Sequence, residues 1–511
     1  MSGCALRFGR IRFRLRDMKH HRFCDLILLW LLFLSSLMAG PSYVDQKGTL
    51  IVDGKPFFIM GCFTDPTAPY NKRIETIDDL SSGGFNCMYS SGGGLKNFSL
   101  FDQYHDYAHR KGIKILSIAA KDDESHSYYI QKMNHVWDNE AILGWYIADD
   151  ANWKSLTDLY RLHEQAKAID SIHVTTISFY SSPWEDWDGF RLGLYCRTCD
   201  VVQMQSYPIG KEPVDEVYKD MLHTTQIANR YHRPVVIDLQ TYDWQNSGHD
   251  WGRMPTPAEI DLMSYLAVAA GVQGIMYFSY LDYMSYPVSP MSQSKPRHWQ
   301  AMCRAAREIG YLDQIYLHGE HRTEHSREHL YHAYWQYDNS LYLIVINTSE
   351  SDTEEVAIDL PRYDWGPLHK IFTYRPGGCS LYRTHVSGTI GPQEVQIYKT
   401  TIPTAIDPAR DGSTASAFTL YPVCPNPFNG TVRIEYAIAQ TGEIELTIFD
   451  LLGNEVRRIV DERQTAQRYH YTWNATDMEG QRVPSAVYLL RLLYQSGAEE
   501  TVQFAKLMLL R

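Results

Sequence analysis

Cysteine is scarce in this chain, with nine among 511 residues, and seven of them follow residue 40. An odd number without regular spacing is not the pattern of a disulfide-stapled scaffold. Cys196 and Cys199 form one CxxC pair with no second pair, so a zinc site is not indicated. The remaining interpretations of Cys196 and Cys199 are free thiols or a local disulfide. No metal and no cofactor are predicted.

The chain also lacks the basic excess of a nucleic-acid-binding protein. Its formal net charge is −12, and seven of its 48 Lys and Arg residues stand in the first forty positions, against two of its 60 Asp and Glu residues. The remainder is therefore more acidic than the whole chain, and an acidic surface repels polyanions. Nucleic acid is not expected as a partner.

Only one long apolar run occurs, at residues 26–39 (LILLWLLFLSSLMA). Basic residues precede it, Gly40, Pro41 and Ser42 follow it, and it is short for a membrane span. This pattern predicts a secretory signal peptide over residues 1–40, with a retained membrane anchor as the alternative. The protein is expected to be secreted or held at the cell surface.

No glycine-rich phosphate turn follows the first strand-like run, which disfavours a doubly wound sheet. Instead, eight short apolar runs alternate with amphipathic segments across residues 43–315, which predicts a (β/α)8 barrel. The eight runs are Pro56–Phe63, Asn86–Ser91, Lys114–Ala120, Ile142–Asp149, Val174–Tyr180, Val201–Pro208, Val235–Gln240 and Gly274–Leu281. Thr256, Pro257 and Glu259 predict a helix start with a capping box.

After the barrel, the periodicity changes from helical to strand-like. Residues 325–400 carry alternating runs separated by turn residues, which predicts an antiparallel β-sandwich packed on the barrel. A stretch rich in Thr, Ser and Pro predicts a linker over residues 401–418. Alternation over residues 419–511 predicts a C-terminal Ig-like β-sandwich. The predicted chain is therefore multidomain.

Catalysis in (β/α)8 barrels takes place where the strands end and the following loops begin. The predicted strand ends and the loops after them carry carboxylates, aromatic rings and an amide. These candidate site residues are Trp145, Asp149, Asp150, Tyr207, Gln240, Asp243, Trp244, Tyr280 and Asp282. Rings and acidic groups suit a neutral sugar, which stacks on rings and offers hydroxyls. Two carboxyl groups that face each other across such a site could hydrolyse a glycosidic bond.

Each of these features also has a structural interpretation. Asp149 and Asp150 are adjacent on a strand and point to opposite sides, so one of them can brace a neighbouring strand or loop. Tyr207 is either a ligand contact or a packed turn residue. Asp238 lies inside an apolar run, which favours a buried structural role. The His-rich tract at residues 318–332 leads into a strand-like run, so a metal site is not favoured there.

Two segments resemble clan-A-like bacterial glycoside hydrolase barrels. Residues 48–58 (GTLIVDGKPFF) resemble the entry hairpin, and residues 141–151 (AILGWYIADDA) resemble the fourth strand, commonly written GWYLADEP. The Glu of that motif is the acid/base in related retaining glycosidases; here Asp150 stands at its position, and Ala151 at that of the Pro. The resemblance, over residues 43–400, implies Asp150 as the general acid, with apolar neighbours such as Trp145 favouring its protonated form.

The seventh strand departs from the resembled families. Gln240 stands in the strand where they carry a nucleophilic Glu, and an amide cannot form a glycosyl-enzyme intermediate. Either another carboxylate, such as Asp243 or Asp282, is the base of an inverting reaction, or the barrel binds glycans without cleaving them. A hydrolase acting on a poly- or oligosaccharide is the leading hypothesis. The alternatives are a non-catalytic surface glycan-binding protein with a degenerate site and a structural envelope protein.

Residues 419–511 resemble the C-terminal sorting domain of type IX secretion cargo. The similar segments are residues 421–428 (YPVCPNPF), 446–453 (LTIFDLLG), 471–473 (YTW) and 480–488 (GQRVPSAVY). Two residues interrupt the first motif, and Ala486 replaces the usual Gly. The resemblance implies export across the outer membrane, with the secretion machinery as a partner of residues 419–511. A simple accessory β-domain is the alternative.

Overall fold

The computed structural model describes most of the chain after residue 40. The described residues are 41–64, 70–90, 98–118, 126–180, 189–248, 250, 252–282, 285, 288–362, 365–402, 418–421, 423, 425–438, 440–451, 453–496 and 499–510. The predicted signal peptide and most of the predicted linker lie outside these ranges. The chain divides into two compact units, Met1–Thr401 and Ile402–Arg511. Within the described ranges, no helix is both long and apolar enough to cross a membrane.

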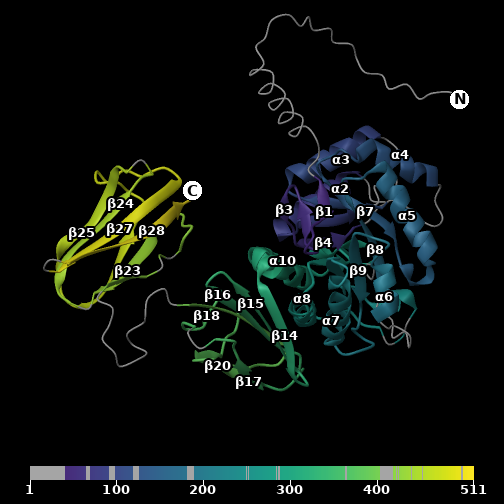
Figure 1. Ribbon diagram of the computed structural model, residues 1–511. Coiled ribbons are helices and arrows are strands. Elements are labelled where there is room, and N and C mark those ends of the chain that lie inside the picture. Colours follow the sequence, from purple (N-terminus) through teal and green to yellow (C-terminus); the bar gives the residue numbers. More distant parts are fainter. Residues whose placement is uncertain are drawn as a thin grey trace, which may run out of the picture. The chain divides into compact units, whose positions relative to one another are not determined.

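Eight parallel strands close into a barrel in the first unit (Figure 1). They are β4 (Ile59–Phe63), β5 (Cys87–Ser90), β6 (Lys114–Ile118), β7 (Ile142–Ala148), β8 (Val174–Tyr180), β9 (Val201–Ser206), β10 (Val235–Gln240) and β11 (Gly274–Phe278). Each lies within one of the eight apolar runs, so the predicted barrel is confirmed. β10 pairs with both β9 and β11, and β11 pairs with β4, which closes the ring.

A helix follows each barrel strand and covers the outside of the ring. These helices are α2 (Tyr70–Gly83), α3 (Phe98–Arg110), α4 (His126–Val136), α5 (Leu156–Ile169), α6 (Gly189–Tyr195), α7 (Glu216–Asn229), α8 (Pro257–Ala269) and α10 (Pro296–His318). The predicted capping box at α8 is confirmed: the Thr256 hydroxyl accepts from the Glu259 N–H, and the Glu259 carboxylate accepts from the Thr256 N–H. The short elements η1 (Ala151–Trp153), η2 (Trp244–Ser247), β12 (Leu281–Asp282), β13 (Ser289–Pro290) and α9 (Met291–Ser294) lie in the connections.

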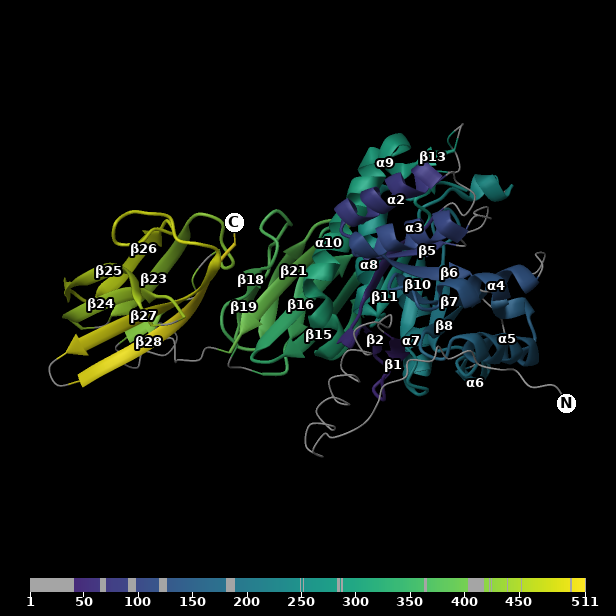
Figure 2. The ribbon, with the colours of Figure 1, turned by 90° about the horizontal axis from the view of Figure 1, so that it is seen from above.

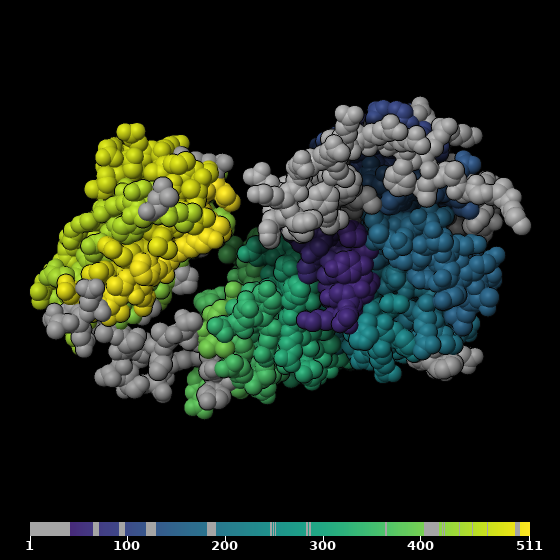
Figure 3. All heavy atoms as spheres, turned by 45° about the horizontal axis from the view of Figure 1, so that its top comes forward, coloured from purple at the N-terminus to yellow at the C-terminus, as the bar shows by residue number. Residues whose placement is uncertain are grey.

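An N-terminal hairpin covers the end of the barrel where the strands begin. Its strands are β1 (Ser42–Val44), β2 (Leu50–Val52) and β3 (Lys55–Pro56). Leu50 and Val52 pack with the side chains that fill the barrel interior. The Ser42 hydroxyl bonds to the Leu143 carbonyl and accepts from the Val174 N–H, at the starts of β7 and β8. The purple surface in Figure 3 includes this hairpin. The opposite end, where the strands finish, is thereby left for the site.

Two antiparallel sheets follow the barrel within the first unit. One has the order β14-β15-β16-β21-β18 and the other β17-β20-β19. Their strands are β14 (Glu320–Arg327), β15 (Leu330–Tyr337), β16 (Ser340–Asn347), β17 (Glu354–Asp359), β18 (His369–Lys370), β19 (Ser380–Tyr382), β20 (His385–Ile390) and β21 (Glu394–Thr401). α8 contacts the barrel on one side and β15, β16 and β21 on the other (Figure 2). This double contact explains why α8 is apolar around most of its circumference.

A buried charge cluster joins these sheets to the barrel helices. Arg375 donates two hydrogen bonds of 2.9 Å to the carboxylate of Asp261 on α8 and one of 2.8 Å to Glu308 on α10. The hydroxyl of Tyr374 donates to the other oxygen of Glu308, at 2.6 Å. The guanidinium also lies 4.7 Å from the ring centroid of Tyr265. Because these ionised groups are buried, each depends on its partners for stabilisation.

The second unit consists of antiparallel strands around one apolar core. The sheets have the orders β22-β23-β26 and β25-β24-β27-β28. The strands are β22 (Phe418–Leu420), β23 (Val432–Ile438), β24 (Gly442–Phe449), β25 (Glu455–Gln464), β26 (Gln467–Trp473), β27 (Ala486–Ser496) and β28 (Glu499–Leu509). Ile434 and Tyr436 of β23 and Leu446 and Leu490 of the other sheet share the core. The expected antiparallel β-rich regions after the barrel are therefore present.

Candidate active site

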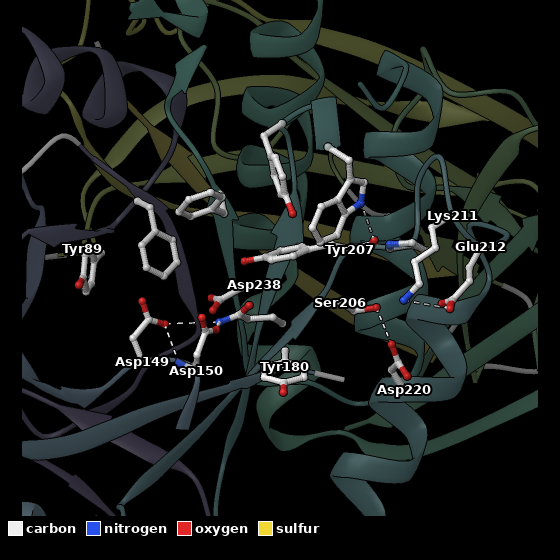
Figure 4. Close-up of a pocket in the computed structure, with 16 residues that line it drawn as sticks. Tyr89, Asp149, Asp150, Tyr180, Ser206, Tyr207, Lys211, Glu212, Asp220 and Asp238 are labelled. Carbon is white, nitrogen blue, oxygen red and sulfur yellow. Dashed lines mark hydrogen bonds and ion pairs between the residues drawn. The ribbon is translucent and has the colours of Figure 1, made fainter. Parts of the chain in front are cut away.

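A cavity of about 490 Å³ opens where the barrel strands finish (Figure 4). Its walls come from the ends of seven strands, from the residues after them and from Asp220 on α7. The lining residues are Phe63, Tyr89, Asp149, Asp150, Tyr180, Gln205, Ser206, Tyr207, Pro208, Lys211, Glu212, Asp220, Asp238, Tyr242, Trp244 and Phe278. Four of the residues singled out in the sequence, Asp149, Asp150, Tyr207 and Trp244, meet here.

Asp149 and Asp150 follow β7 and are exposed to solvent at the cavity. Asp149 Oδ1 accepts from the Tyr146 hydroxyl at 2.7 Å, from the Asp150 N–H at 3.1 Å and from Gln205 Nε2 at 3.4 Å. Asp150 Oδ1 accepts from the same Gln205 nitrogen at 3.0 Å. One amide therefore holds both carboxyl groups, and Asp149 has more donors directed at its carboxylate than Asp150.

The backbone fixes Asp150 at the start of η1. Its φ of 44° and ψ of 43° lie in the left-handed region, where Asp and Asn are tolerated better than most other residues. Two residues later, the Asn152 amide bonds to the end of β8, accepting from the Tyr180 N–H at 2.9 Å and donating to its carbonyl at 3.1 Å. The turn that carries Asp150 is thus tied to the neighbouring strand.

A third carboxyl group, Asp238 of β10, is fully buried in the cavity wall and lies beside this pair in Figure 4. The Ser178 hydroxyl lies 3.0 Å from Asp238 Oδ2, and Gln203 Nε2 donates to Oδ1 at 2.5 Å. Burial raises the pKa of Asp238 well above its usual range; the two hydrogen bonds oppose this shift, while the charges of Asp149 and Asp150 add to it. Burial thus favours the protonated form of Asp238, beside two exposed carboxyl groups.

Aromatic rings form the opposite wall. The ring centroid of Tyr207 lies 5.3 Å from that of Tyr242 and 6.2 Å from that of Trp244, both edge to face. The Trp244 indole donates to the Tyr207 carbonyl at 3.2 Å. Burial raises the pKa of Tyr207, which keeps its hydroxyl protonated. Packed rings of this kind offer flat apolar faces to a ligand.

Polar pairs mark the far end of the cavity in Figure 4. The Ser206 hydroxyl donates to Asp220 at 2.7 Å, and Lys211 Nζ lies 3.3 Å from the Glu212 carboxylate. Among the described lining residues, Lys211 is the only cation. The cavity thus combines several hydrogen-bonding groups with stacked rings.

Trp145 does not line the cavity, in contrast to the sequence-based expectation. Its side chain is fully buried on the outside of β7, in the layer between strands and helices, and its indole donates to Asp170 at 2.7 Å. Its neighbour Tyr146 points into the barrel instead. Trp145 therefore does not supply an apolar surface around Asp150.

Gln240 does not line the cavity either. The side chain is fully buried, accepts from the Ile209 N–H at 2.8 Å, and donates to the carbonyls of Ile209 and Tyr242, both at 3.1 Å. All of these partners belong to the backbone of two loops. Gln240 thus holds loops in place, and its amide is not presented to a ligand.

The remaining predicted residues also lie outside the cavity lining. Asp243 caps η2, accepting from the Gln245 N–H at 2.8 Å. Tyr280 is buried and donates to Asp79 at 2.8 Å, and Asp282 is buried with Lys295 Nζ at 3.9 Å. Asp243 and Asp282 are therefore poorly placed to be the second carboxylate of a hydrolase.

Sequence reasoning did not select Tyr89, Tyr180, Gln205 or Asp238 as site residues. For Gln205 a signal existed, because it stands two positions before Tyr207 and strand residues of equal parity share a face. In the described part of the chain, no group of His, Cys, Asp and Glu side chains is arranged to hold a metal ion. His321, from the His-rich tract, bonds to the Ala269 carbonyl and stacks on Trp335.

Comparison with known proteins agrees with this architecture. Residues 151–309 match the glycoside hydrolase family 42 model, described as beta-galactosidase. The barrel is glycoside hydrolase-like. Its fold is similar to that of a glycoside hydrolase family 5 protein from Bacteroides vulgatus ATCC 8482, with 15% identity and a TM-score of 0.52 over 74% of this chain and 95% of that chain.

Another similar structure is an alpha-amylase from Geobacillus thermoleovorans, complexed with acarbose. It is 12% identical, with a TM-score of 0.48 over 68% of this chain and 98% of that chain. No curated protein matches the chain.

Proposed function

We propose that the protein is a secreted glycoside hydrolase that acts on an oligo- or polysaccharide in the cavity at the barrel mouth. The observation that carries this proposal is the meeting of Asp149 and Asp150 with the rings of Tyr207 and Trp244 around one cavity of about 490 Å³. The match to the family described as beta-galactosidase makes galactosides the first substrates to test.

In this proposal, Asp150 is the general acid that protonates the glycosidic oxygen. Asp149 has three donors within hydrogen-bond distance and Asp150 one, so the Asp149 carboxyl group is the more firmly held of the two. The Asp149 carboxylate then stabilises the positive charge that develops on the sugar ring.

The test is incubation of the full chain with a panel of oligosaccharides, polysaccharides and aryl glycosides, with products followed by mass. Lactose and an aryl β-galactoside belong in the panel. Release of a shorter glycan or of the aryl alcohol, with saturation kinetics, supports the proposal. Saturable binding without any product supports the second candidate instead.

The second candidate is a surface protein that binds glycans without cleaving them. The buried position of Gln240 favours it, because the last residue of β10 is then neither a carboxylate nor turned toward the cavity, and the carboxyl group of Asp238 on the same strand is fully buried. The rings and hydrogen-bonding groups that line the cavity would remain as a binding site. Binding measured by calorimetry on the same panel separates this candidate from a structural envelope protein, which binds none of the sugars.

Trp244 should contribute strongly to sugar binding in either case. Replacing Trp244 by Ala removes a ring that lines the cavity, and we expect affinity for the bound glycan to fall about tenfold or more. Calorimetry with the glycan found in the panel measures the change. Tyr311→Ala is the control, since that ring lies exposed on α10 away from the cavity lining. Equal affinities of both variants would contradict the assignment of Trp244.

We also propose that residues 419–511 direct export through the outer-membrane secretion machinery, which leaves the protein secreted or at the cell surface. The resemblance of this segment to type IX sorting domains supports the proposal, together with the predicted signal peptide. A chain truncated after residue 402 should accumulate in the periplasm of a host with that machinery, while the full chain reaches the medium or the surface. Fractionation measures this, and export of the truncated chain would refute it.

A further inference from the structure

Trp153 is the most exposed large hydrophobic side chain of the described residues, at 79%. It is the last residue of η1, three positions after Asp150. Tryptophan is highly buried on average, so an indole this exposed is unusual. Single exposed rings do occur on protein surfaces without a function, and exposure alone therefore assigns no role to Trp153. Its position next to the cavity does.

The indole of Trp153 continues the cavity lining outward. Its ring centroid lies 6.0 Å from that of Tyr180, with an angle of 44° between the ring planes. Tyr180 ends β8 and lines the cavity, and Figure 4 shows it on the same side of the cavity as Asp150. Trp153 itself is not a lining residue. The two rings therefore lead from the cavity to the surface just outside it.

The backbone that carries Trp153 is held on both sides. Asn152 is buried, and its side-chain amide bonds to the N–H and the carbonyl of Tyr180. After Trp153, the Ser155 hydroxyl accepts from the Asp158 N–H at 3.1 Å and caps α5. The point from which the indole projects is thus fixed. A ligand that covers the indole then has to order only two side-chain dihedral angles, which keeps the entropic cost of binding low.

We propose that Trp153 and Tyr180 form an outer subsite, on which one residue of a glycan chain stacks while another residue of the same chain occupies the cavity beside Asp150. This inference rests on the proposed function, because it specifies which glycans the same site takes. An exposed indole offers a flat apolar face to the apolar face of a sugar ring. The preferred ligand is therefore an oligo- or polysaccharide that extends past the cavity, and not a short glycoside that fills the cavity alone.

Replacement of Trp153 by Ala tests the subsite with glycans of increasing length. The probes are β-linked galacto-oligosaccharides from the disaccharide upward, or the same series in the linkage that the panel identifies, with an aryl glycoside of the same sugar as the short reference. In the wild type, kcat/KM should rise once the chain is long enough to reach Trp153. The variant should lose about tenfold on the long members and stay within about twofold of the wild type on the aryl glycoside.

Two further variants separate stacking from a general effect of the substitution. Trp153→Phe keeps a flat ring and should recover most of the loss. Tyr160→Ala is the matched control, because Tyr160 is an exposed ring (52%) on α5 that does not line the cavity. Both side chains are exposed, so neither alanine variant should change the unfolding midpoint. Equal length dependence in Trp153→Ala and Tyr160→Ala would overturn the subsite and leave the hydrolase proposal standing.

Fluorescence quenching tests the subsite without any turnover. Acrylamide should quench Trp153 in the free protein, and the signal of Trp153 is the part of the quenching that Trp153→Phe removes. A long oligosaccharide of the series should protect this signal, whereas the aryl glycoside should not. If long chains bind and protect Trp153 but no glycoside is cleaved, the hydrolase proposal fails and the subsite stands. If no glycan of the series binds, or if glycans bind and leave the quenching of Trp153 unchanged, the subsite is overturned.

Discussion

Replacement of Asp150 by Asn is expected to lower turnover of an unactivated glycoside by about 10²–10⁴-fold, the usual contribution of a general acid. The amide has nearly the shape of the carboxyl group but cannot give up a proton at neutral pH. Because Asn tolerates the left-handed backbone conformation found at Asp150, with φ of 44°, the turn should be preserved. The loss should therefore reflect chemistry and not misfolding.

The measurement is kcat/KM on the oligosaccharide identified in the panel, and in parallel on an aryl glycoside with a good leaving group. The kcat/KM for the aryl glycoside should fall much less, because its leaving group departs with little protonation. Asp338→Asn is the matched control, an exposed Asp with φ of 52° in the turn between β15 and β16. Unchanged turnover of both substrates by the Asp150 variant would exclude Asp150 as the acid.

Replacement of Arg375 by Ala should destabilise the first unit by about 3–5 kcal/mol, the range observed when one partner of a buried ion pair is removed. The guanidinium serves Asp261 and Glu308 together, through bonds of 2.5–2.9 Å. Without it, two carboxylates face an interior with little solvent. Arg304, 3.2 Å from Asp261, compensates for only one of them.

Urea unfolding of the full chain, followed by tryptophan fluorescence and circular dichroism, measures this loss. Arg322→Ala is the control, because Arg322 pairs with Glu320 at the surface and such pairs contribute only about 0–1 kcal/mol. The transition of the second unit should be unchanged in both variants. A loss below about 1 kcal/mol for Arg375→Ala would mean that the cluster does not hold the sheets to the barrel.

The barrel was predictable because its strands are buried on both faces. Continuous apolar runs such as Val235–Gln240 mark such strands in any sequence. The sequence reveals β14 and β25 less clearly for the opposite reason: both are edge strands, with exposed and charged side chains. Charged side chains on an edge strand protect the sheet from aggregation. They also remove the alternation of apolar and polar residues from which a strand is predicted.

The site was predictable only in part. The side of a strand toward which a side chain points depends on how that strand pairs with its neighbours as well as on its position in the sequence. The register between β7 and β8 shifts between Tyr146 and Ala148, where a bulge changes which side chains turn inward. Its position near the end of the fourth strand suggested that Trp145 lies at the mouth, but the structure places Tyr146 inside the barrel and Asp149 with Asp150 at the rim. Asp238 was expected to be buried, and it is; its connection to the rim depends on Ser178 and Gln205 from two other strands.

The closure of the barrel has a consequence for the order in which the chain can fold. β11 pairs with β4, Gly274 opposite Ile59, so the last barrel strand completes a sheet begun by the first. Until β11 has been synthesised, β4 and β10 each present an unpaired edge, and loop closure over so long a separation is slow. A nascent chain that stops short of residue 278 cannot complete the ring. The barrel is therefore expected to close late, only after all eight of its strands are available.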